Sequence, residues 1–278
     1  MGFDQLKART LVTIFGAPVV VILVLLGKLP LLFLVSLILV VSLYEFYQLA
    51  EKKGAFPDRW FSMIAALLIL WDMYFYWVEH LLLILTLYLV VISIFQLWQK
   101  KGSQIQNLSA SLWGVAYLGI LLSFFVGIRQ LPLQLGQPYK EGGLWVVAIL
   151  VSIWIGDSIA YFVGSSLGKH KLASRVSPKK TIEGAIGGFI GMMLVAFISR
   201  YLFRLSWSLI DTAVIGLICG TIGQISDLVE SLFKRDAGVK DTAHILPGHG
   251  GFFDRFDVLF LTSPLIFFYL KYLSSYVR

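Results

Sequence analysis

Long apolar runs, separated by short polar segments, make up most of this chain. Each run is about 20 residues long, the length that an α-helix needs to cross the hydrocarbon core of a bilayer. The pattern predicts nine transmembrane helices, over residues 11–27, 31–50, 60–77, 81–98, 112–129, 143–164, 184–203, 206–226 and 256–272. We therefore expect an all-α, polytopic bundle that is integral to a membrane.

The positions of Lys and Arg predict how this bundle is oriented. If the polar segments alternate between two sides, most of the 23 basic residues fall on the side of the N-terminus. Cytoplasmic loops of membrane proteins are enriched in Lys and Arg. We expect a cytoplasmic N-terminus, an external C-terminus, and a cytoplasmic location for the two long polar connections around 169–180 and 231–257.

Composition agrees with a membrane-embedded chain. Hydrophobic residues make up 58% of the 278 residues and charged residues 14%, against roughly 45–50% and about 25% in soluble domains. The net charge of +7 is interpreted as topology and attraction to anionic lipid, and we expect no nucleic-acid partner. The one cysteine, Cys219, excludes an intrachain disulfide, and packing is favoured over a reactive thiol.

Ionisable residues distinguish an N-terminal region, 1–140, from a C-terminal region, 141–278. In the first region Glu45, Asp72 and Arg129 lie near the ends of predicted spans, and we interpret them as structural groups that pair locally or reach the interface. In the second region Asp157 lies in a predicted span, where a carboxylate needs a cation, a hydrogen bond or water. We expect region 1–140 to be structural and lipid-facing, and region 141–278 to be catalytic.

The basic connection before residue 184 ends in the sequence SPKKTIEG. Its charge by itself is explained by topology or by contact with anionic head groups. Ser177, Pro178 and Thr181, however, are typical of a helix start, where free backbone N–H groups hold phosphate oxygens. We therefore expect a phosphate-binding helix N-terminus beside Lys179 and Lys180, although the spacing of a P-loop is absent. In the span that follows, glycines four residues apart predict close helix packing.

A second constellation begins where the span 206–226 ends. On a helix, Asp227, Glu230, Ser231 and Lys234 share one face, as they would on an ordinary solvated helix end. Further carboxylates follow at Asp236, Asp241, Asp254 and Asp257. Carboxylates without a cysteine cluster or a close histidine pair favour a hard divalent ion, Mg²⁺ before Zn²⁺. His249 is favoured as a hydrogen-bonding residue over a metal ligand.

Four cations accompany these carboxylates: Lys234, Arg235, Lys240 and Arg255. Metal ligands together with cationic phosphate clamps are typical of phosphoryl or nucleotidyl transfer, in which positioning and charge neutralisation supply most of the catalysis.

This stretch resembles the signature of the CDP-diacylglycerol synthase family, also called phosphatidate cytidylyltransferase. The matching positions are Ser231, Lys234, Arg235, Lys240, Asp241, His249, Gly250, Gly251, Asp254, Arg255 and Asp257. The segments GDSIAYFVGSSLGKHKL and SPKKTIEG resemble the family too, so the similarity covers residues 156–257. One departure is Ser226, where the family usually has Gly; it bears on local helix packing more than on the chemistry.

The resemblance implies that CTP and phosphatidic acid are converted to CDP-diacylglycerol and pyrophosphate, with Mg²⁺ required. It also implies a membrane enzyme, expected to be a homodimer, whose site opens to the cytoplasm. The metal set expected is one or two ions on Asp227 and Asp254, supported by Asp241 and Asp257; a monovalent cation such as K⁺ is compatible with it. The residues expected to bind triphosphate or lipid phosphate, or to line the polar cavity, are Lys179, Lys180, Lys234, Arg235, Arg255, Asp157, Ser177, Thr181, Ser231, Gly250 and Gly251.

Three alternatives remain open on the sequence. A CTP-dependent polyprenol or lipid kinase would transfer the γ-phosphate instead. A cation transporter would also place carboxylates in a helical bundle, but it does not explain the clustered Lys and Arg. A basic scaffold that only binds anionic lipid would not need Asp227 or Asp254.

Overall fold

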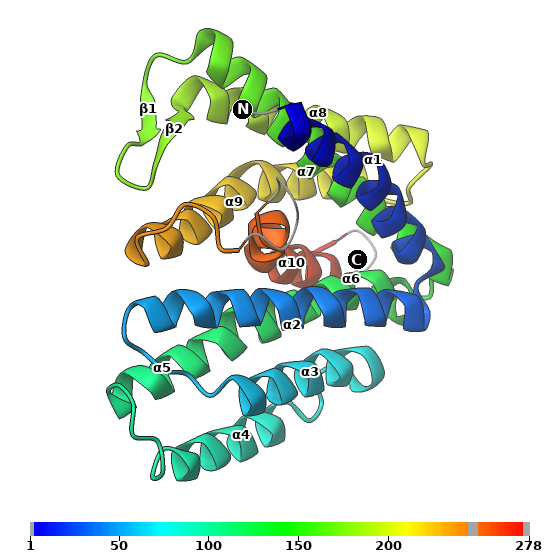
Figure 1. Ribbon diagram of the computed structural model, residues 1–278. Coiled ribbons are helices and arrows are strands. Elements are labelled where there is room, and N and C mark those ends of the chain that lie inside the picture. Colours follow the sequence, from blue (N-terminus) through cyan, green and yellow to red (C-terminus); the bar gives the residue numbers. More distant parts are fainter. Residues whose placement is uncertain (1–2, 244–249, 275–278) are drawn as a thin grey trace. The chain divides into compact units, whose positions relative to one another are not determined.

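In the part of the chain that the structure describes, the protein is all-α apart from one short β-hairpin. A computed structural model describes residues 3–243 and 250–274, with side chains from residue 14 onward (Figure 1). The helices are α1 (Phe3–Leu26), α2 (Lys28–Lys52), α3 (Arg59–Tyr76), α4 (Leu81–Phe95), α5 (Gln104–Gly114), the π-helical segment η1 (Val115–Ile120), α6 (Leu121–Gln134), α7 (Tyr139–Leu167), α8 (Ile182–Leu202), α9 (Leu209–Asp236) and α10 (Phe253–Tyr272). The two strands are β1 (Lys171–Ala173) and β2 (Ser177–Thr181).

All nine apolar stretches predicted from the sequence fall on helices. Within the described residues, five helical segments are long and apolar enough to cross a membrane: Lys28–Lys52, Gln104–Gln134, Tyr139–Leu167, Ile182–Leu202 and Leu209–Asp236. An integral membrane protein built from helices is therefore confirmed. The count of nine crossings stays a prediction.

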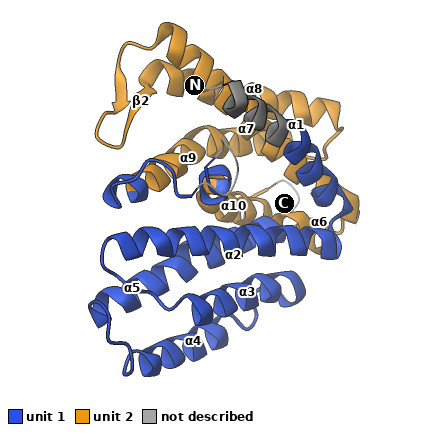
Figure 2. Ribbon diagram, viewed as in Figure 1, with its two compact units in different colours: residues 1–127, 233–256 blue, residues 128–232, 257–278 orange. Residues whose placement is uncertain are grey.

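The chain forms two compact units, which are shown in different colours in Figure 2. Unit 1 comprises Met1–Gly127 and Phe233–Phe256, and unit 2 comprises Ile128–Leu232 and Asp257–Arg278. Each unit therefore combines residues from both of the regions, 1–140 and 141–278, that the sequence distinguishes.

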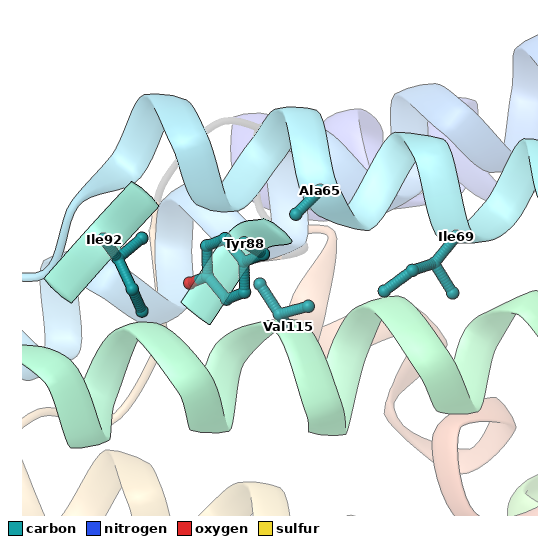
Figure 3. Close-up of a cluster of buried hydrophobic side chains, with 5 residues drawn as sticks. All are labelled: Ala65, Ile69, Tyr88, Ile92 and Val115. Atoms are coloured by element: carbon teal, nitrogen blue, oxygen red, sulfur yellow. The ribbon is translucent and has the colours of Figure 1, made fainter. Parts of the chain in front are cut away.

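A small apolar cluster holds the helices of unit 1 together. Ala65 and Ile69 on α3, Tyr88 and Ile92 on α4 and Val115 on η1 are all buried and pack against one another (Figure 3). The hydroxyl of Tyr88 also lies 2.7 Å from that of Ser62, so its polar end is paired inside the cluster. Helices α3, α4 and η1 thereby bury their apolar faces against one another.

Unit 2 is built around the close packing of α7 against α8. A Cβ on Gly184 would lie 2.8 Å from the backbone oxygen of Ala160 and 3.0 Å from Cα of Gly164. A Cβ on Gly188 would lie 2.8 Å from the Cβ of Ala160. Small residues let two helix backbones approach this closely. The packing role predicted for these glycines is confirmed.

The connection between α7 and α8 corrects one prediction. Ser177 and Pro178 do not start a helix, because Ser177–Thr181 forms strand β2, which pairs antiparallel with β1. Helix α8 begins at Ile182, and its N-cap is Thr181, whose hydroxyl accepts a hydrogen bond from Gly184 N at 3.2 Å. Of the three predicted helix-start residues, only Thr181 has that role.

Two of the isolated ionisable residues pair locally, as predicted. Asp72 accepts hydrogen bonds from His80 N at 3.0 Å and, through its other oxygen, contacts His80 Nδ1 at 2.8 Å. Arg129 is 1% exposed, donates to the backbone oxygen of Tyr139 at 2.7 Å and stacks on the ring of that residue. Asp72 and Arg129 therefore have a structural role, as predicted.

Candidate active site

Aromatic side chains anchor the signature stretch within unit 1. Phe233, at the end of α9, and Phe253, at the start of α10, stack with ring centroids 6.5 Å apart. Phe46 of α2 and Tyr117 of η1 pack edge-on against Phe233, at 5.6 Å and 5.5 Å. The residues next to these two phenylalanines, Lys234 and Asp254, therefore start from fixed backbone positions.

Lys234 and Asp254 form an ion pair in unit 1. Lys234 Nζ lies 2.7 Å from Asp254 Oδ1, and the two side chains are 12% and 6% exposed. The other oxygen, Asp254 Oδ2, accepts hydrogen bonds from Thr242 N at 3.1 Å, from the Thr242 hydroxyl at 2.8 Å and from Gly251 N at 2.8 Å. Charge-assisted hydrogen bonds of this kind are roughly twice as strong as neutral ones. Asp254 is thus held rigidly.

Glu45 of α2 is a residue of this cluster that the sequence pattern assigned to structure alone. It is fully buried. Its Oε2 accepts from the Thr242 hydroxyl at 3.0 Å and from Phe253 N at 2.8 Å, and its Oε1 accepts from Phe252 N at 3.0 Å. The available signal was an acidic residue within a predicted span, but partners about 200 positions away are invisible to a local pattern.

The glycines of the signature leave room for these contacts. A Cβ on Gly251 would run into the carboxylate of Glu45 and the hydroxyl of Thr242. Gly250 has φ +79°, a left-handed conformation that favours glycine. His249 lies outside the described residues.

A cavity of about 620 Å³ opens beside this cluster in unit 1. Helix α2 contributes Tyr44, Gln48 and Lys52, which are four residues apart and share a face, and the segment after α9 contributes Val239, Lys240, Asp241, Thr242 and Ala243. The sequence-predicted residues Lys240 and Asp241 are both exposed here. The lining combines two cations, one carboxylate, a hydroxyl, an amide and an aromatic ring, which suits a polar ligand that carries phosphate groups.

The two arginines of the signature are exposed. Arg235 donates through Nη1 to the backbone oxygen of Val239 at 3.0 Å. Arg255 lies in the first turn of α10, where its backbone N–H donates to the oxygen of Phe252 at 3.0 Å.

A second polar cluster lies within unit 2. Lys180 Nζ, on β2, pairs with Asp227 Oδ2, on α9, and both side chains are partly exposed. Asp157 on α7 and Asp257 on α10 interact electrostatically with Asp227, with Lys180 and with each other. One carboxylate oxygen from each of Asp227, Glu230 and Asp257 lies within 4.8 Å of the other two. Lys180 is therefore a cation in contact with a group of mutually repelling carboxylates.

Hydroxyl groups set the positions of two residues in this cluster. The Ser226 hydroxyl donates to the backbone oxygen of Asp257 at 2.5 Å and so connects α9 with α10. Ser231, one turn after Asp227 on α9, contacts Asp227 Oδ1 at 3.5 Å. The departure from the family pattern at Ser226 is accommodated by a buried hydrogen bond.

Lys179 and Ser177 remain apart from this ion pair. The structure places both on β2, where Lys179 is exposed and Ser177 is half-buried. Strand geometry explains the difference from Lys180, because successive side chains point to opposite faces.

Comparison with known proteins decides the family. A family model described as "Cytidylyltransferase family" matches residues 7–273, nearly the whole chain. The chain belongs to the cytidylyltransferase family. The resemblance stated from the signature residues is thereby confirmed.

Curated relatives cover the chain almost from end to end. The chain is 33% identical over 280 residues to the phosphatidate cytidylyltransferase of Bacillus subtilis, covering 97% of this chain and 99% of that protein. It is 32% identical over 256 residues to the phosphatidate cytidylyltransferase of Synechocystis, covering 85% and 86%. The phosphatidate cytidylyltransferase of Staphylococcus aureus is 31% identical over 264 residues, covering 94% and 97%.

The carboxylates of unit 2 fit the metal ion that the resemblance implies. Mg²⁺ and similar hard cations take oxygen ligands, usually one or two carboxylates together with substrate phosphates and water. Asp227, Glu230 and Asp257 offer such oxygens close together. Asp227 and Asp257 were predicted as ligands, whereas Glu230 was named only as part of the helix face. Asp254 and Asp241 belong to unit 1, and their metal role stays a prediction.

Proposed function

We propose that this protein is a phosphatidate cytidylyltransferase, a membrane enzyme that converts CTP and phosphatidic acid to CDP-diacylglycerol and pyrophosphate. The observation that carries this proposal is the match, over 97% of the chain, with a relative of that name. The clustered lysines and carboxylates support it, because nucleotidyl transfer needs charge neutralisation around phosphate groups.

The reaction needs no nucleophile from the protein. A phosphate oxygen of phosphatidic acid attacks the α-phosphorus of CTP and forms the new P–O bond. The bond between the α-phosphorus and the oxygen that bridges to the β-phosphate breaks, and pyrophosphate leaves with the electron pair. Both reactants are anions, so the main task of the protein is to hold them in line despite their repulsion. Ser231 contacts the carboxylate of Asp227, and we assign it a positioning role.

The cations of the two clusters are proposed to bind the phosphates. In unit 2 Lys180 is in contact with Asp227, and Lys179 is exposed on the same strand. In unit 1 Lys234 is held by Asp254, while Arg235 and Arg255 are exposed. Fixed cations neutralise the charge that develops on the leaving pyrophosphate without the cost of reorganising solvent. Asp157 would complete the polar surroundings, and Gly250 and Gly251 let backbone approach a ligand.

Asp227, Glu230 and Asp257 are proposed to hold Mg²⁺. When bound, the ion would withdraw charge from the phosphate oxygens of the substrates. Ligation by Asp254 and Asp241, a second ion, and K⁺ as a further cation stay predictions from the resemblance.

The cavity of unit 1 is proposed to receive the nucleotide. Lys52 and Lys240 line it and suit a triphosphate. Tyr44 and Gln48 offer a ring face and a paired donor and acceptor, the groups with which proteins recognise a nucleobase. Thr242 belongs both to this lining and to the network around Asp254.

Orientation and assembly are further parts of the proposal. The distribution of Lys and Arg along the sequence supports a cytoplasmic N-terminus and a site that opens to the cytoplasm, where CTP is present. We also propose a homodimer, on the basis of the family resemblance, and a division of labour in which residues after 141 carry most of the catalytic groups.

The deciding experiment is an assay of the purified protein in detergent or vesicles with α-³²P-CTP, phosphatidic acid and Mg²⁺. We expect labelled CDP-diacylglycerol and unlabelled pyrophosphate in equal amounts. Release of CDP with phosphorylation of a lipid would identify a kinase, and cation flux into sealed vesicles without CTP would identify a transporter. Absence of CDP-diacylglycerol from an assay of folded protein would refute the proposal.

A further inference from the structure

The carboxylate of Glu45 joins α2 to two short segments of unit 1 that follow about 200 positions later in the sequence. It lies on α2 and accepts hydrogen bonds from the Thr242 hydroxyl, from Phe252 N and from Phe253 N. Thr242 N donates to Asp254 Oδ2. The Thr242 hydroxyl lies 3.0 Å from Glu45 Oε2 and 2.8 Å from Asp254 Oδ2, so its single proton is shared between the two carboxylates. Glu45 is therefore one residue removed from the ion pair of Asp254 with Lys234.

We propose that Glu45 is a positioning residue for nucleotidyl transfer: it caps helix α10 and, through Thr242, fixes the carboxylate of Asp254 against Lys234. This inference rests on the proposed function and adds to it a residue of the N-terminal region, which the sequence pattern had assigned to structure alone.

The cap has a clear physical basis. The first N–H groups of a helix lack partners within the helix, and a negative charge near them is stabilised by the helix dipole. Phe252 and Phe253 stand at the start of α10, and Glu45 accepts from both of their N–H groups. The carboxylate of α2 thus does for α10 what a side chain of the N-cap residue usually does.

Burial makes this arrangement specific. Glu45 is 0% exposed, and among the described residues it forms no ion pair with Lys, Arg or His. A buried carboxylate is tolerated only where hydrogen bonds replace its hydration. It therefore favours the one geometry in which both oxygens meet their donors. Gly251 is part of that geometry, because a Cβ there would collide with Glu45.

Aromatic contacts connect the same segment of α2 to the residues next to Lys234 and Asp254. Phe46, next to Glu45, packs edge-on against Phe233 and Phe253. These are the neighbours of Lys234 and Asp254 along the chain. The segment of α2 at 45–46 thus contacts both ends of the signature stretch in unit 1, through hydrogen bonds and through rings.

The first test compares Glu45→Gln with Asp72→Asn. Each change replaces a buried carboxylate of unit 1 by an amide, but the carboxylate of Asp72 bonds only to His80 in the described residues. In the Glu45→Gln variant the new amide NH₂ would face a backbone N–H donor at one of the two oxygen positions. We expect this variant to lower kcat by about tenfold or more, since small misplacements of catalytic groups have large effects. The KM for phosphatidic acid should change by less than about threefold, as expected when only a transition-state interaction is lost.

Asp72→Asn should retain wild-type kcat within about twofold, because in the described part of the chain Asp72 holds His80 and contacts none of the proposed catalytic residues. Its loss would affect stability and not the reaction. If the two variants are equally active, the proposal is wrong. If the wild-type protein itself makes no CDP-diacylglycerol, the proposed function fails instead, so the two failures are distinguishable.

A double-mutant cycle provides a readout that a purely structural role would not change. Thr242→Val removes the hydroxyl that is shared by Glu45 and Asp254 and keeps the shape of the side chain. If Glu45 acts through Thr242, the double variant should lose only about as much kcat as the worse single variant, because residues in one network are not additive. Losses that multiply independently would overturn the proposal.

A second pair of variants decides the matter if Glu45→Gln does not yield folded protein. Thr242→Ser keeps the hydroxyl and Thr242→Val does not. We expect the serine variant to stay within about threefold of wild type and the valine variant to lose about tenfold in kcat, the size of effect that misplacing Asp254 should have. Equal kcat values for the serine and valine variants would show that the connection from Glu45 to Asp254 is not needed, and would refute the proposal.

Discussion

The hydroxyl of Ser226 on α9 donates a hydrogen bond of 2.5 Å to the backbone oxygen of Asp257 on α10. Ser226 is fully buried, and Asp257 is 7% exposed. The neighbour of Ser226 in the chain is Asp227, so this one bond sets the spacing between two of the three proposed metal ligands. A position that departs from the usual family residue thus contributes directly to the geometry of the unit 2 cluster.

Removing this hydrogen bond should lower the stability of the folded protein. Ser226→Ala should lower the free energy of unfolding by about 1 kcal/mol, the usual net value of a buried hydrogen bond. The measurement is thermal unfolding of the purified protein in detergent, with Ser158→Ala as the control, since Ser158 is exposed and donates only to its own helix, to the oxygen of Trp154. An unchanged Tm for Ser226→Ala would contradict the assignment.

Lys180 should matter far more for activity than Lys171 on the paired strand of the hairpin. Lys180→Met removes the cation that contacts Asp227, and we expect kcat/KM to fall by about 100-fold, as when one fixed electrostatic contact to the transition state is lost. Lys171→Met, on the paired strand and exposed, should stay within about threefold of wild type, because surface charges are screened. Similar losses in both variants would indicate a general effect of charge at the membrane surface.

Chelation should abolish activity reversibly. We expect EDTA to stop the reaction and Mg²⁺ to restore it, because oxygen ligands hold such ions reversibly. Asp227→Asn, Glu230→Gln and Asp257→Asn should each raise the Mg²⁺ concentration for half-maximal activity by about tenfold or more, a change of about 1.4 kcal/mol. Direct titration with Mn²⁺, followed by electron paramagnetic resonance, checks binding without relying on turnover.

Asp211→Asn is the matched control for these metal variants. Asp211 is buried in unit 2 and contacts Ser208 N and the Tyr269 hydroxyl, away from the three ligands in the sequence. Its amide variant should leave the Mg²⁺ dependence unchanged even if it lowers stability. If Asp211→Asn shifts the Mg²⁺ dependence as much as the cluster variants do, the shift reports a general loss of structure and the metal assignment fails.

Replacing Gln48 should raise the KM for the nucleotide and not the KM for the lipid. If the unit 1 cavity receives the nucleotide, Gln48→Leu should raise the KM for CTP by about tenfold while the KM for phosphatidic acid stays within about twofold, since a site that hydrogen-bonds a polar group loses affinity when its partner is removed. The exposed Gln106, outside the lining of this cavity, provides the control variant Gln106→Leu. A rise confined to the KM for phosphatidic acid would place the lipid in the cavity instead.

The outcome at the β-hairpin explains where a local pattern fails. Ser177, Pro178 and Thr181 are all typical of a helix start, and Thr181 does cap α8. Ser177 and Pro178 instead lie within strand β2, because residues 177–181 pair with residues 171–173. Cap preferences act over three or four residues, whereas the choice between strand and helix start depended on that pairing.

The sequence by itself determined the helical membrane architecture, the close packing at Gly184 and Gly188, and the family, because length, apolar content and motif spacing are local properties of the chain. Only the tertiary structure decided that Glu45 of α2 accepts hydrogen bonds from Thr242 and from the start of α10, and that Asp257 of α10 lies beside Asp227 and Glu230 of α9. The physical reason is the same in both cases. A carboxylate in an apolar setting must find donors or cations, but which ones it finds depends on which distant segments the fold brings against it.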